Sequence, residues 1–572
     1  MSNHIAKFLI PLLLAQTCYA LEQSSAPELA SSIEAKPQVT AKHAMIVTNN
    51  KYATQAANEI LQAGGNAFDA AIAAGFVLGL TEPQSSGIGG GGYAITYQGR
   101  HKQLQVYDGR EVAPASATAD WFLDEKQQPL PFKQAVLSTK SIGVPGEVAL
   151  FYKLHQKQGK LAWSKLLQPA ITLANNGFEM SPRLHKLLSA DIDLFKNNVA
   201  VKNIYFNGND IKPINSIIKN KPYAETLTII AKQPTEFYRG KLANSIIDDI
   251  NKNAGKNIYH KNDFANYQVV LHPALCKHYR TQYQICTVPP SSGGGVTLLE
   301  LMTMYATRID AHQYDDINWT YYFLESSKLA YADRNQYLAD PAFIPQPVRG
   351  LLANDYLQAR ATLITDRALT MPVAAGTPQG VDPLYAPDNH TKEKGTTSLV
   401  IVDRDNNAIS MTVTVESQFG SHLFTHGFFL NNELTDFSFT AKNDKGRLIA
   451  NRVEPGKRPR SSITPVIVFK NDKLHALSGS PGGSEIICYV AKNLILMLDM
   501  NLGPASASAK PNLCAASRVV LESNKSPAYL QNLKQRGEEI SDADLVSGVT
   551  NIIRHGDAWL GAADPRREGV AM

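Results

Sequence analysis

The chain has 572 residues, of which 44% are hydrophobic and 19% are charged, and this composition excludes a disordered chain and favours one large domain or two. The 56 basic residues nearly balance the 51 acidic ones and leave a net charge of +5, so nucleic acid is not an expected partner. Five cysteines are too few for a disulfide-dense scaffold, and neither they nor the 14 histidines have the spacing of a zinc site.

Residues 1–20 have the pattern of a secretory signal peptide. Lys7 precedes a short apolar run at 8–15, and the small residues Cys18 and Ala20 fit a cleavage site after Ala20. A membrane anchor is the alternative, but the run is shorter than the ~20 residues that a spanning helix needs. We therefore expect an exported protein, periplasmic or secreted, with no membrane span. Residues 21–42, rich in Ser, Ala, Pro and Glu, are expected to form a mobile leader.

Hydrophobic periodicity predicts both helices and strands. In chain order they are helices at 52–63 and 67–80, strands at 93–97 and 104–107, a mainly helical region at 147–340 with breaks at Pro169, Pro182 and Pro213, strands from 396 onward, and helices at 484–499 and 526–536. Residues 372–395 are rich in Pro and Gly and are expected to form an exposed loop that ends at a strand.

Four cysteines follow the predicted signal peptide. Cys276 and Cys286 flank a stretch that could fold as a hairpin, so a disulfide between them is one interpretation and two buried free thiols are the other. Cys488 and Cys514 are a second candidate pair.

The glycine run at 87–92 satisfies the GxGxxG pattern of dinucleotide-binding proteins. That fingerprint requires a strand before the glycines and a helix after them, because the phosphate binds at the helix N-terminus. Here the predicted helix comes before and the strand after, so we do not expect a nucleotide. Two interpretations stay open: a tight turn where backbones pack closely, and a glycine loop that supports a site.

Thr396 begins a predicted buried strand directly after the loop 372–395. If the chain were cut before Thr396, the new α-amine could act as the base for the hydroxyl of the same residue. The strand turns at 404–407, and symmetric pairing about that turn places Thr414 opposite Thr397. Threonines also begin many strands that have no catalytic role.

Two further clusters contain groups that could complete a site. In KRPRSS (457–462), paired hydroxyls follow basic residues; in SPGGS (480–484), backbone N–H groups before a predicted helix could bind an oxyanion. Each segment alone is also typical of an ordinary turn. The residues by themselves thus predict an exported α/β protein with a candidate threonine nucleophile.

Taken together, these segments resemble γ-glutamyltranspeptidase precursors, which are N-terminal nucleophile (Ntn) hydrolases. The resemblance runs from about Ala44 to about Pro565. The matching motifs are VTNN (47–50), GGNAFDAA (64–71), EPQSSGIGGGGY (82–93), DGREVAPASAT (108–118), PPSSGGG (289–295), KLAYADR (328–334), GTTSLVIVD (395–403), FGSH (419–422), NNELTDFS (431–438), KRPRSSITP (457–465), GSPGGS (479–484) and GAADPRR (561–567). The glycine run is itself part of this family signature.

The resemblance implies a catalytic role for several matched residues. Thr396 would cleave the Gly395–Thr396 bond and then act as the catalytic nucleophile. Thr414 matches the threonine whose hydroxyl supports the nucleophile. Gly482 and Gly483 match the backbone groups of the oxyanion hole.

The resemblance also implies residues that bind the γ-glutamyl donor. These are Arg110, Ser461 and Ser462 for the α-carboxylate, and Glu433 and Asp436 for the α-ammonium. Glu416 occupies a further substrate-contacting position that is Asn in the best-known members, which is a departure from the family pattern.

The implied fold is α+β, a four-layer αββα sandwich with two stacked antiparallel sheets. Self-cleavage would give a large subunit, residues 43–395 after the leader, and a small subunit, residues 396–572, which form an intertwined heterodimer. The implied partners are small molecules: glutathione, other γ-glutamyl amides, and amino-acid acceptors. No cofactor and no metal is implied.

Three alternatives compete with this prediction. An acylase of the same superfamily that cuts glutaryl or cephalosporin side chains needs no ammonium pocket, and Glu433 and Asp436 argue against it. A dinucleotide oxidoreductase is disfavoured by the order of elements around the glycines. A binding protein with an inactive site is disfavoured by the intact set of Thr396, Thr414 and the two glycines at 482–483.

Overall fold

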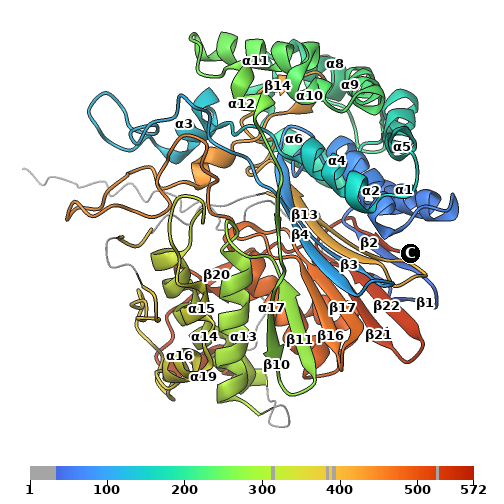
Figure 1. The fold of residues 1–572 in the computed structure, drawn as a ribbon. Coiled ribbons are helices and arrows are strands. Elements are labelled where there is room, and N and C mark those ends of the chain that lie inside the picture. Colours follow the sequence, from blue (N-terminus) through green and yellow to red (C-terminus); the bar gives the residue numbers. More distant parts are fainter. Residues whose placement is uncertain (1–33, 311–315, 382–384, 389–394, 523–526) are drawn as a thin grey trace, which may run out of the picture.

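Two antiparallel sheets lie face to face at the centre of the molecule (Figure 1). The structure is a computed structural model that describes residues 34–310, 316–381, 385–388, 395–522 and 527–572, so the expected signal peptide lies outside the described residues. In sheet A the strand order is β1 (Val39–Ala41), β22 (Ala558–Ala563), β21 (Thr550–His555), β17 (Lys473–Gly479), β16 (Val466–Lys470), β11 (Tyr283–Thr287) and β10 (Leu275–Tyr279). In sheet B it is β23 (Val570–Ala571), β2 (Met45–Thr48), β12 (Thr397–Val402), β13 (Ala408–Thr414), β3 (Gly91–Gln98), β4 (Gln103–Gly109) and β9 (Val270–His272).

Helices cover the outer face of each sheet, which confirms the expected four-layer αββα sandwich. The layer on sheet B contains α1 (Lys51–Gln62), α2 (Ala67–Thr81), α4 (Glu147–Gln158) and α5 (Trp163–Asn176) (Figure 1). The layer on sheet A contains α13 (Gly294–Arg308), α14 (Asp316–Tyr337), α17 (Ile486–Leu498) and α18 (Pro504–Ala509). Among the described helices, none is both long and apolar enough to cross a membrane.

Shorter elements complete the molecule. In the chain between β4 and β9 lie α3 (Phe132–Val136), η1 (Thr139–Ser141), α6 (Pro182–Ala190), α7 (Ile192–Phe195), α8 (Val199–Tyr205), α9 (Lys221–Lys232), α10 (Glu236–Arg239), α11 (Lys241–Ala254), α12 (Lys261–Ala265) and the strands β5 (Phe178–Glu179), β6 (Phe206–Asn207), β7 (Asp210–Ile211) and β8 (Ile217–Ile218). Later in the chain lie α15 (Val348–Leu351), α16 (Asn354–Ala361), β14 (Phe424–Thr425), β15 (Phe428–Phe429), η2 (Glu433–Asp436), η3 (Gly483–Glu485), β18 (Leu513–Ala515), β19 (Val519–Glu522), α19 (Pro527–Gln535) and β20 (Ile540–Ala543).

Strand β12, which carries the candidate nucleophile at its start, is buried on both faces. Leu399 and Ile401 belong to the core beneath α2, whereas Val400 and Val402 belong to the core between the two sheets. Because side chains alternate along a strand, burial on both faces requires a continuous apolar run. The SLVIV segment supplies that run and fixes the strand in the middle of the sandwich.

The register of β12 and β13 differs by one residue from our prediction. Thr397 pairs with Val413, not with Thr414, so Thr414 lies next to Thr396. The reason is Asp403, whose carboxylate accepts hydrogen bonds from the backbone N–H groups of Asp405 and Asn407 at 2.9 and 3.0 Å. These bonds draw Asp403 into the turn and shift the pairing. The correction strengthens the candidate site, because it brings the two threonines together.

One other prediction about local structure was wrong. Helix α5 continues through Pro169 instead of breaking there, and its flanking residues Leu166, Leu167 and Ala170 are buried. Burial of this apolar face offsets the hydrogen bond that proline cannot donate. Within the expected mobile leader, residues 39–41 form β1, which pairs with β22 at the edge of sheet A. Strand pairing at this edge supplies the hydrogen bonds that hold the segment.

Strands from the two sides of Gly395–Thr396 are interleaved in both sheets. In sheet A, β22, β21, β17 and β16 come from the C-terminal side, and β1, β11 and β10 at the two edges come from the N-terminal side. In sheet B, β12 and β13 from the C-terminal side lie between β2 and β3. A chain cut at that bond would therefore still share two sheets and one core.

Both candidate disulfides are present. Cys276 and Cys286 face each other across the β10–β11 hairpin, and Cys488 on α17 is bonded to Cys514 on β18. The predicted hairpin is confirmed, and the alternative of free thiols at these positions is wrong.

The glycine run packs backbone against backbone. It follows α2 and leads into β3, so the element order that argued against a dinucleotide site is confirmed. A Cβ at Gly89 would lie 2.1 Å from the carbonyl oxygen of Phe429, and a Cβ at Gly90 would lie 1.9 Å from that of Thr414. Larger residues would push these segments apart. The glycine loop therefore also supports Thr414, and the two interpretations left open by the sequence describe one structure.

Candidate active site

The Gly395–Thr396 peptide is buried at the start of β12. The Thr396 hydroxyl donates a hydrogen bond to the Gly395 carbonyl oxygen. The Thr414 hydroxyl donates to the same oxygen at 3.2 Å and accepts a hydrogen bond from the Glu416 backbone N–H at 2.8 Å. Two hydroxyls thus converge on the carbonyl of the peptide that the sequence predicts to be cut.

Only glycine fits at position 395 in this conformation. Gly395 has φ +76°, and a Cβ would lie 2.1 Å from the Glu416 carbonyl oxygen. Glu416 itself has φ +77°, in the left-handed region that few non-glycine residues adopt. The two residues thus hold the peptide close to Thr414 through backbone geometry.

Two buried charged residues, Arg567 and Glu82, form hydrogen bonds with Thr396 and Thr397 where strand β12 begins. Arg567 donates to the Thr396 carbonyl oxygen at 2.8 Å, and Glu82 accepts a hydrogen bond from the Thr397 hydroxyl at 2.8 Å. Burial raises the pKa of Glu82 to about 7, although Arg567 nearby opposes the increase. Neither residue was predicted to have a role, yet both lie in motifs that carried the resemblance.

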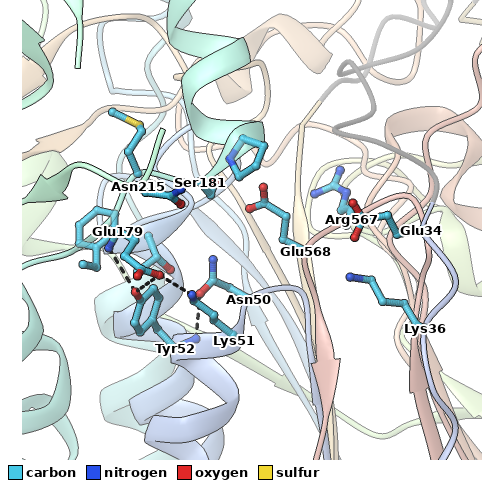
Figure 2. A pocket seen from close by; sticks show the side chains of 14 residues that line it. Glu34, Lys36, Asn50, Lys51, Tyr52, Glu179, Ser181, Asn215, Arg567 and Glu568 are labelled. Atoms are coloured by element: carbon cyan, nitrogen blue, oxygen red, sulfur yellow. Dashed lines mark hydrogen bonds and ion pairs between the residues drawn. The ribbon is translucent and has the colours of Figure 1, made fainter. Parts of the chain in front are cut away.

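A cavity of about 230 Å³ opens next to Arg567 (Figure 2). Its walls carry opposite charges, including Lys51 paired with Glu179 at 2.6 Å, and Arg567 and Glu568 on the far side. Arg567, which lines this cavity, also bonds to the Thr396 carbonyl oxygen, whereas Thr396 itself does not line the cavity.

The predicted oxyanion loop lies at the same end of β12. A Cβ at Gly479, which precedes this loop, would lie 2.5 Å from the Ser398 hydroxyl oxygen. Gly482 and Gly483 have φ +135° and +61°, and they lead through η3 into α17. A Cβ at Gly482 would lie 2.3 Å from the Tyr489 ring. Backbone N–H groups of left-handed glycines before a helix can bind an anion.

Arg110 and the predicted ammonium-binding acids form one buried cluster. The Arg110 guanidinium contacts Glu433 through Nη1 and Asp436 through Nη2, the latter at 2.5 Å. It also donates to the carbonyl oxygens of Pro459 and Arg460, directly before Ser461. Burial alone lowers the pKa of Arg110, but the carboxylates, Asp436 first among them, raise it above its usual value. The guanidinium is thus a fixed positive charge.

Three carboxylates surround this guanidinium. One oxygen from each of Glu416, Glu433 and Asp436 lies within 4.8 Å of the others, and all three residues are buried. The structure therefore brings together the predicted carboxylate-binding and ammonium-binding residues and pairs them with each other. Ser461 and Ser462 follow on the same segment as the Arg110 contacts and are also buried.

Two residues of α14 extend the site beyond the predicted set. Arg334 donates from Nη2 to the Ser462 hydroxyl oxygen at 2.5 Å, and the Tyr331 hydroxyl donates to the Ser484 carbonyl oxygen. Both residues lie in the KLAYADR motif, to which the sequence analysis assigned no role. Their contacts join residues more than 100 positions apart in the chain, which no local pattern predicts.

The fold is that of the Ntn hydrolases, and solved structures are similar to it over most of its length. Cephalosporin acylase from Bacillus halodurans has a TM-score of 0.82 and 26% identity, covering 94% of this chain and 96% of that chain. A γ-glutamyltranspeptidase from Pseudomonas nitroreducens, complexed with L-DON, has a TM-score of 0.52 and 31% identity, covering 56% of this chain and 95% of that chain.

Sequence comparison identifies the family within that class. The family model for γ-glutamyltranspeptidase matches residues 53–572. The glutathione hydrolase proenzyme of Bacillus subtilis (strain 168) is 34% identical, covering 93% of this chain and 91% of the relative. That of Escherichia coli (strain K12) is 32% identical and covers 97% of both. The chain belongs to the γ-glutamyltranspeptidase family.

Proposed function

We propose that this chain is a self-processing γ-glutamyltransferase and glutathione hydrolase. One observation carries the proposal: the structure brings two groups of buried residues together. In the first, the Thr396 hydroxyl lies against the Gly395 carbonyl. In the second, the Arg110 guanidinium forms a cluster with carboxylates. The first group supplies a nucleophile. The second has charges complementary to the ammonium and carboxylate of an α-amino acid, which is the head of a γ-glutamyl group.

We propose that processing begins at Gly395. The Thr396 hydroxyl oxygen attacks the Gly395 carbonyl carbon, the peptide C–N bond breaks, and the nitrogen takes a proton to become the α-amine of Thr396. Water then hydrolyses the resulting ester and releases the Gly395 carboxylate. The names of the curated relatives, which are proenzymes, support this step. The interleaved strands would hold the two subunits together.

The mature enzyme would use the same hydroxyl on a γ-glutamyl donor. The Thr396 oxygen attacks the γ-carbonyl, two backbone N–H groups at Gly482 and Gly483 stabilise the oxyanion by ~3 kcal/mol each, and the leaving amine takes a proton relayed by the Thr396 amine. Water or an amino acid then attacks the γ-glutamyl ester. Water completes hydrolysis, and an amine completes transfer.

Donor binding would exchange one set of ion pairs for another. The donor ammonium would lie against Glu433 and Asp436, and the donor carboxylate would meet Arg110 and the serines 461–462. The protein's own Arg110–carboxylate pairs would give way to the opposite charges of the zwitterion. A donor that lacks the ammonium would leave buried carboxylates unpaired, which typically costs about 3–5 kcal/mol.

Export of the protein is also part of this proposal. The pattern of residues 1–20 supports it, and so do two disulfides, since such bonds persist mainly in oxidising compartments. A γ-glutamyltransferase outside the cytoplasm would act on glutathione and related γ-glutamyl compounds there.

The decisive experiment compares two donors that differ by one ammonium. We expect kcat/KM for γ-glutamyl-p-nitroanilide to exceed that for glutaryl-p-nitroanilide at least a hundredfold. Equal or faster turnover of the glutaryl donor would favour the alternative, an acylase, which is the class of the similar Bacillus halodurans structure. A γ-glutamyl preference that persists in Glu416→Asn but collapses in Asp436→Ala would assign the ammonium mainly to Asp436.

Processing has its own test. On a denaturing gel, purified protein should give two fragments, and mass spectrometry should place the break between Gly395 and Thr396. Thr396→Ala should remain one chain. Cleavage of that variant at the same bond under protease-free conditions would refute self-processing without bearing on donor preference.

A further inference from the structure

One turn of α14 holds two loops of the site. Tyr331 and Arg334 are three residues apart and therefore lie on the same face of the helix. Tyr331 bonds to the carbonyl of Ser484, next to the predicted oxyanion glycines, and Arg334 bonds to Ser462. The Arg334 guanidinium also lies 6.0 Å from the centre of the Tyr331 ring. Both side chains are at most 2% exposed.

The hydrogen-bond directions at the two serines are informative. A hydroxyl has one hydrogen to donate and an oxygen that accepts. The Ser462 oxygen accepts from Arg334, and the Ser461 oxygen accepts from the Ile463 backbone N–H at 3.0 Å. In the described part of the chain, neither hydroxyl donates a hydrogen bond to the protein. Both hydrogens are therefore available to an acceptor, and a carboxylate can only accept.

We propose that Arg334 is a positioning residue for donor recognition, which acts through Ser462. Because it donates to the Ser462 oxygen, Arg334 fixes that side chain and directs its hydrogen toward the donor α-carboxylate. Arg334 itself does not touch the donor. This inference rests on the proposed function and extends it to the KLAYADR motif.

The test uses a donor that lacks only the α-carboxylate. 4-Aminobutyryl-p-nitroanilide keeps the ammonium and the scissile amide of γ-glutamyl-p-nitroanilide. With the γ-glutamyl donor, Arg334→Gln should lower kcat/KM about tenfold, mainly by raising KM, since one charge-assisted contact to the donor is weakened. With the 4-aminobutyryl donor, the variant and the parent enzyme should differ by less than twofold.

A double-mutant cycle separates positioning from general destabilisation. In a Ser462→Ala background, Arg334→Gln should have little further effect on the γ-glutamyl donor, because the hydroxyl that Arg334 positions has gone. Arg360→Gln is the matched control: Arg360 is also buried against α14, where it bonds to Asp333 and to the Leu329 carbonyl, away from the serines. Any effect of Arg360→Gln should be equal for the two donors.

The possible outcomes distinguish this inference from the proposed function. If Arg334→Gln impairs both donors equally, or keeps its full effect without Ser462, the inference is wrong although the enzyme assignment stands. If the parent enzyme does not turn over the γ-glutamyl donor, the proposed function itself fails. Should Arg334→Gln not fold, Arg334→Lys keeps the buried charge and must show the same donor-selective loss, with weaker competitive inhibition by L-glutamate but not by 4-aminobutyrate.

Discussion

The two halves of the candidate site are built from different interactions. At the Gly395 carbonyl, the contacts are hydrogen bonds from two hydroxyls, and the geometry depends on two residues with left-handed φ angles. Around Arg110, the contacts are ion pairs among buried side chains. Glu416 belongs to both halves, through its backbone in the first and its carboxylate in the second. Processing should therefore respond to backbone shape, and donor recognition to charge.

The largest effect is expected from Gly395→Ala. The new methyl group would lie 2.1 Å from the Glu416 carbonyl oxygen, so the backbone must shift and disturb the position of the Gly395 carbonyl next to the Thr396 hydroxyl. A displacement of about 1 Å is enough to slow a positioned reaction about a hundredfold. We expect self-cleavage, followed on denaturing gels after rapid purification, to slow by at least that factor.

Gly380→Ala provides the control for this experiment. Gly380 lies upstream in the same loop and also has a left-handed φ of +83°, but a Cβ there would have its nearest neighbour at 4.0 Å. This variant should process at nearly the parent rate. Normal processing of Gly395→Ala would show that backbone shape does not control the first half of the site.

A smaller effect is expected from Arg110→Lys, and it should fall on donor turnover and not on processing. A lysine keeps the charge but cannot contact Glu433 and Asp436 through two separate nitrogens, nor bind a carboxylate in the planar mode of a guanidinium. We expect kcat/KM for γ-glutamyl-p-nitroanilide to fall about ten- to a hundredfold, while processing continues. Arg280→Lys, which alters a remote ion pair with Asp499, should leave both unchanged. Loss of processing in Arg110→Lys would mean that the two halves are not separable.

Local patterns in the sequence predicted the elements well and their long-range contacts poorly. Helices α1 and α2, the two strands that follow the glycine run and the strand after Thr396 were all predicted from periodicity. The capping box that Asn66 and Asp69 form at the start of α2 agrees with that prediction. The register of β12 and β13 was missed because it depends on the Asp403 side chain, which recruits one more residue into the turn.

The same limit applies to the site. The candidate residues came from the family resemblance, and the structure places them close together. The pairing of Arg110 with the acids depends on contacts between residues more than 300 positions apart, and so does the hydrogen bond of Glu82 with Thr397. Arg334 and Arg567 were missed for the same reason, since tertiary packing and not local spacing gives them their partners.

The smallest expected effect concerns Glu82, a titratable group that lies with Arg567 behind the Thr396 half of the site. Burial raises its pKa from the ordinary 4.5 to about 7 in the folded protein. The folded state therefore binds this proton more tightly than the unfolded state does. The resulting stabilisation is complete below about pH 4.5 and is lost as the pH rises through about 7. At ~1.4 kcal/mol per pKa unit, the loss amounts to about 3 kcal/mol.

Glu82→Gln should remove this pH dependence. In a Thr396→Ala background, which we expect to keep the chain uncut, the melting temperature of the parent should fall between pH 5 and pH 8 by about 2 °C more than that of Glu82→Gln. Any change in the strength of the Thr397 hydrogen bond is the same at both pH values, so the comparison across pH cancels it. Glu59→Gln, an exposed position on α1, should follow the parent. If the melting temperatures of the parent and Glu82→Gln changed with pH in parallel, Glu82 would be ionised in the folded state at both pH values. The half of the site around Thr396 would then depend on charge, as the Arg110 half does.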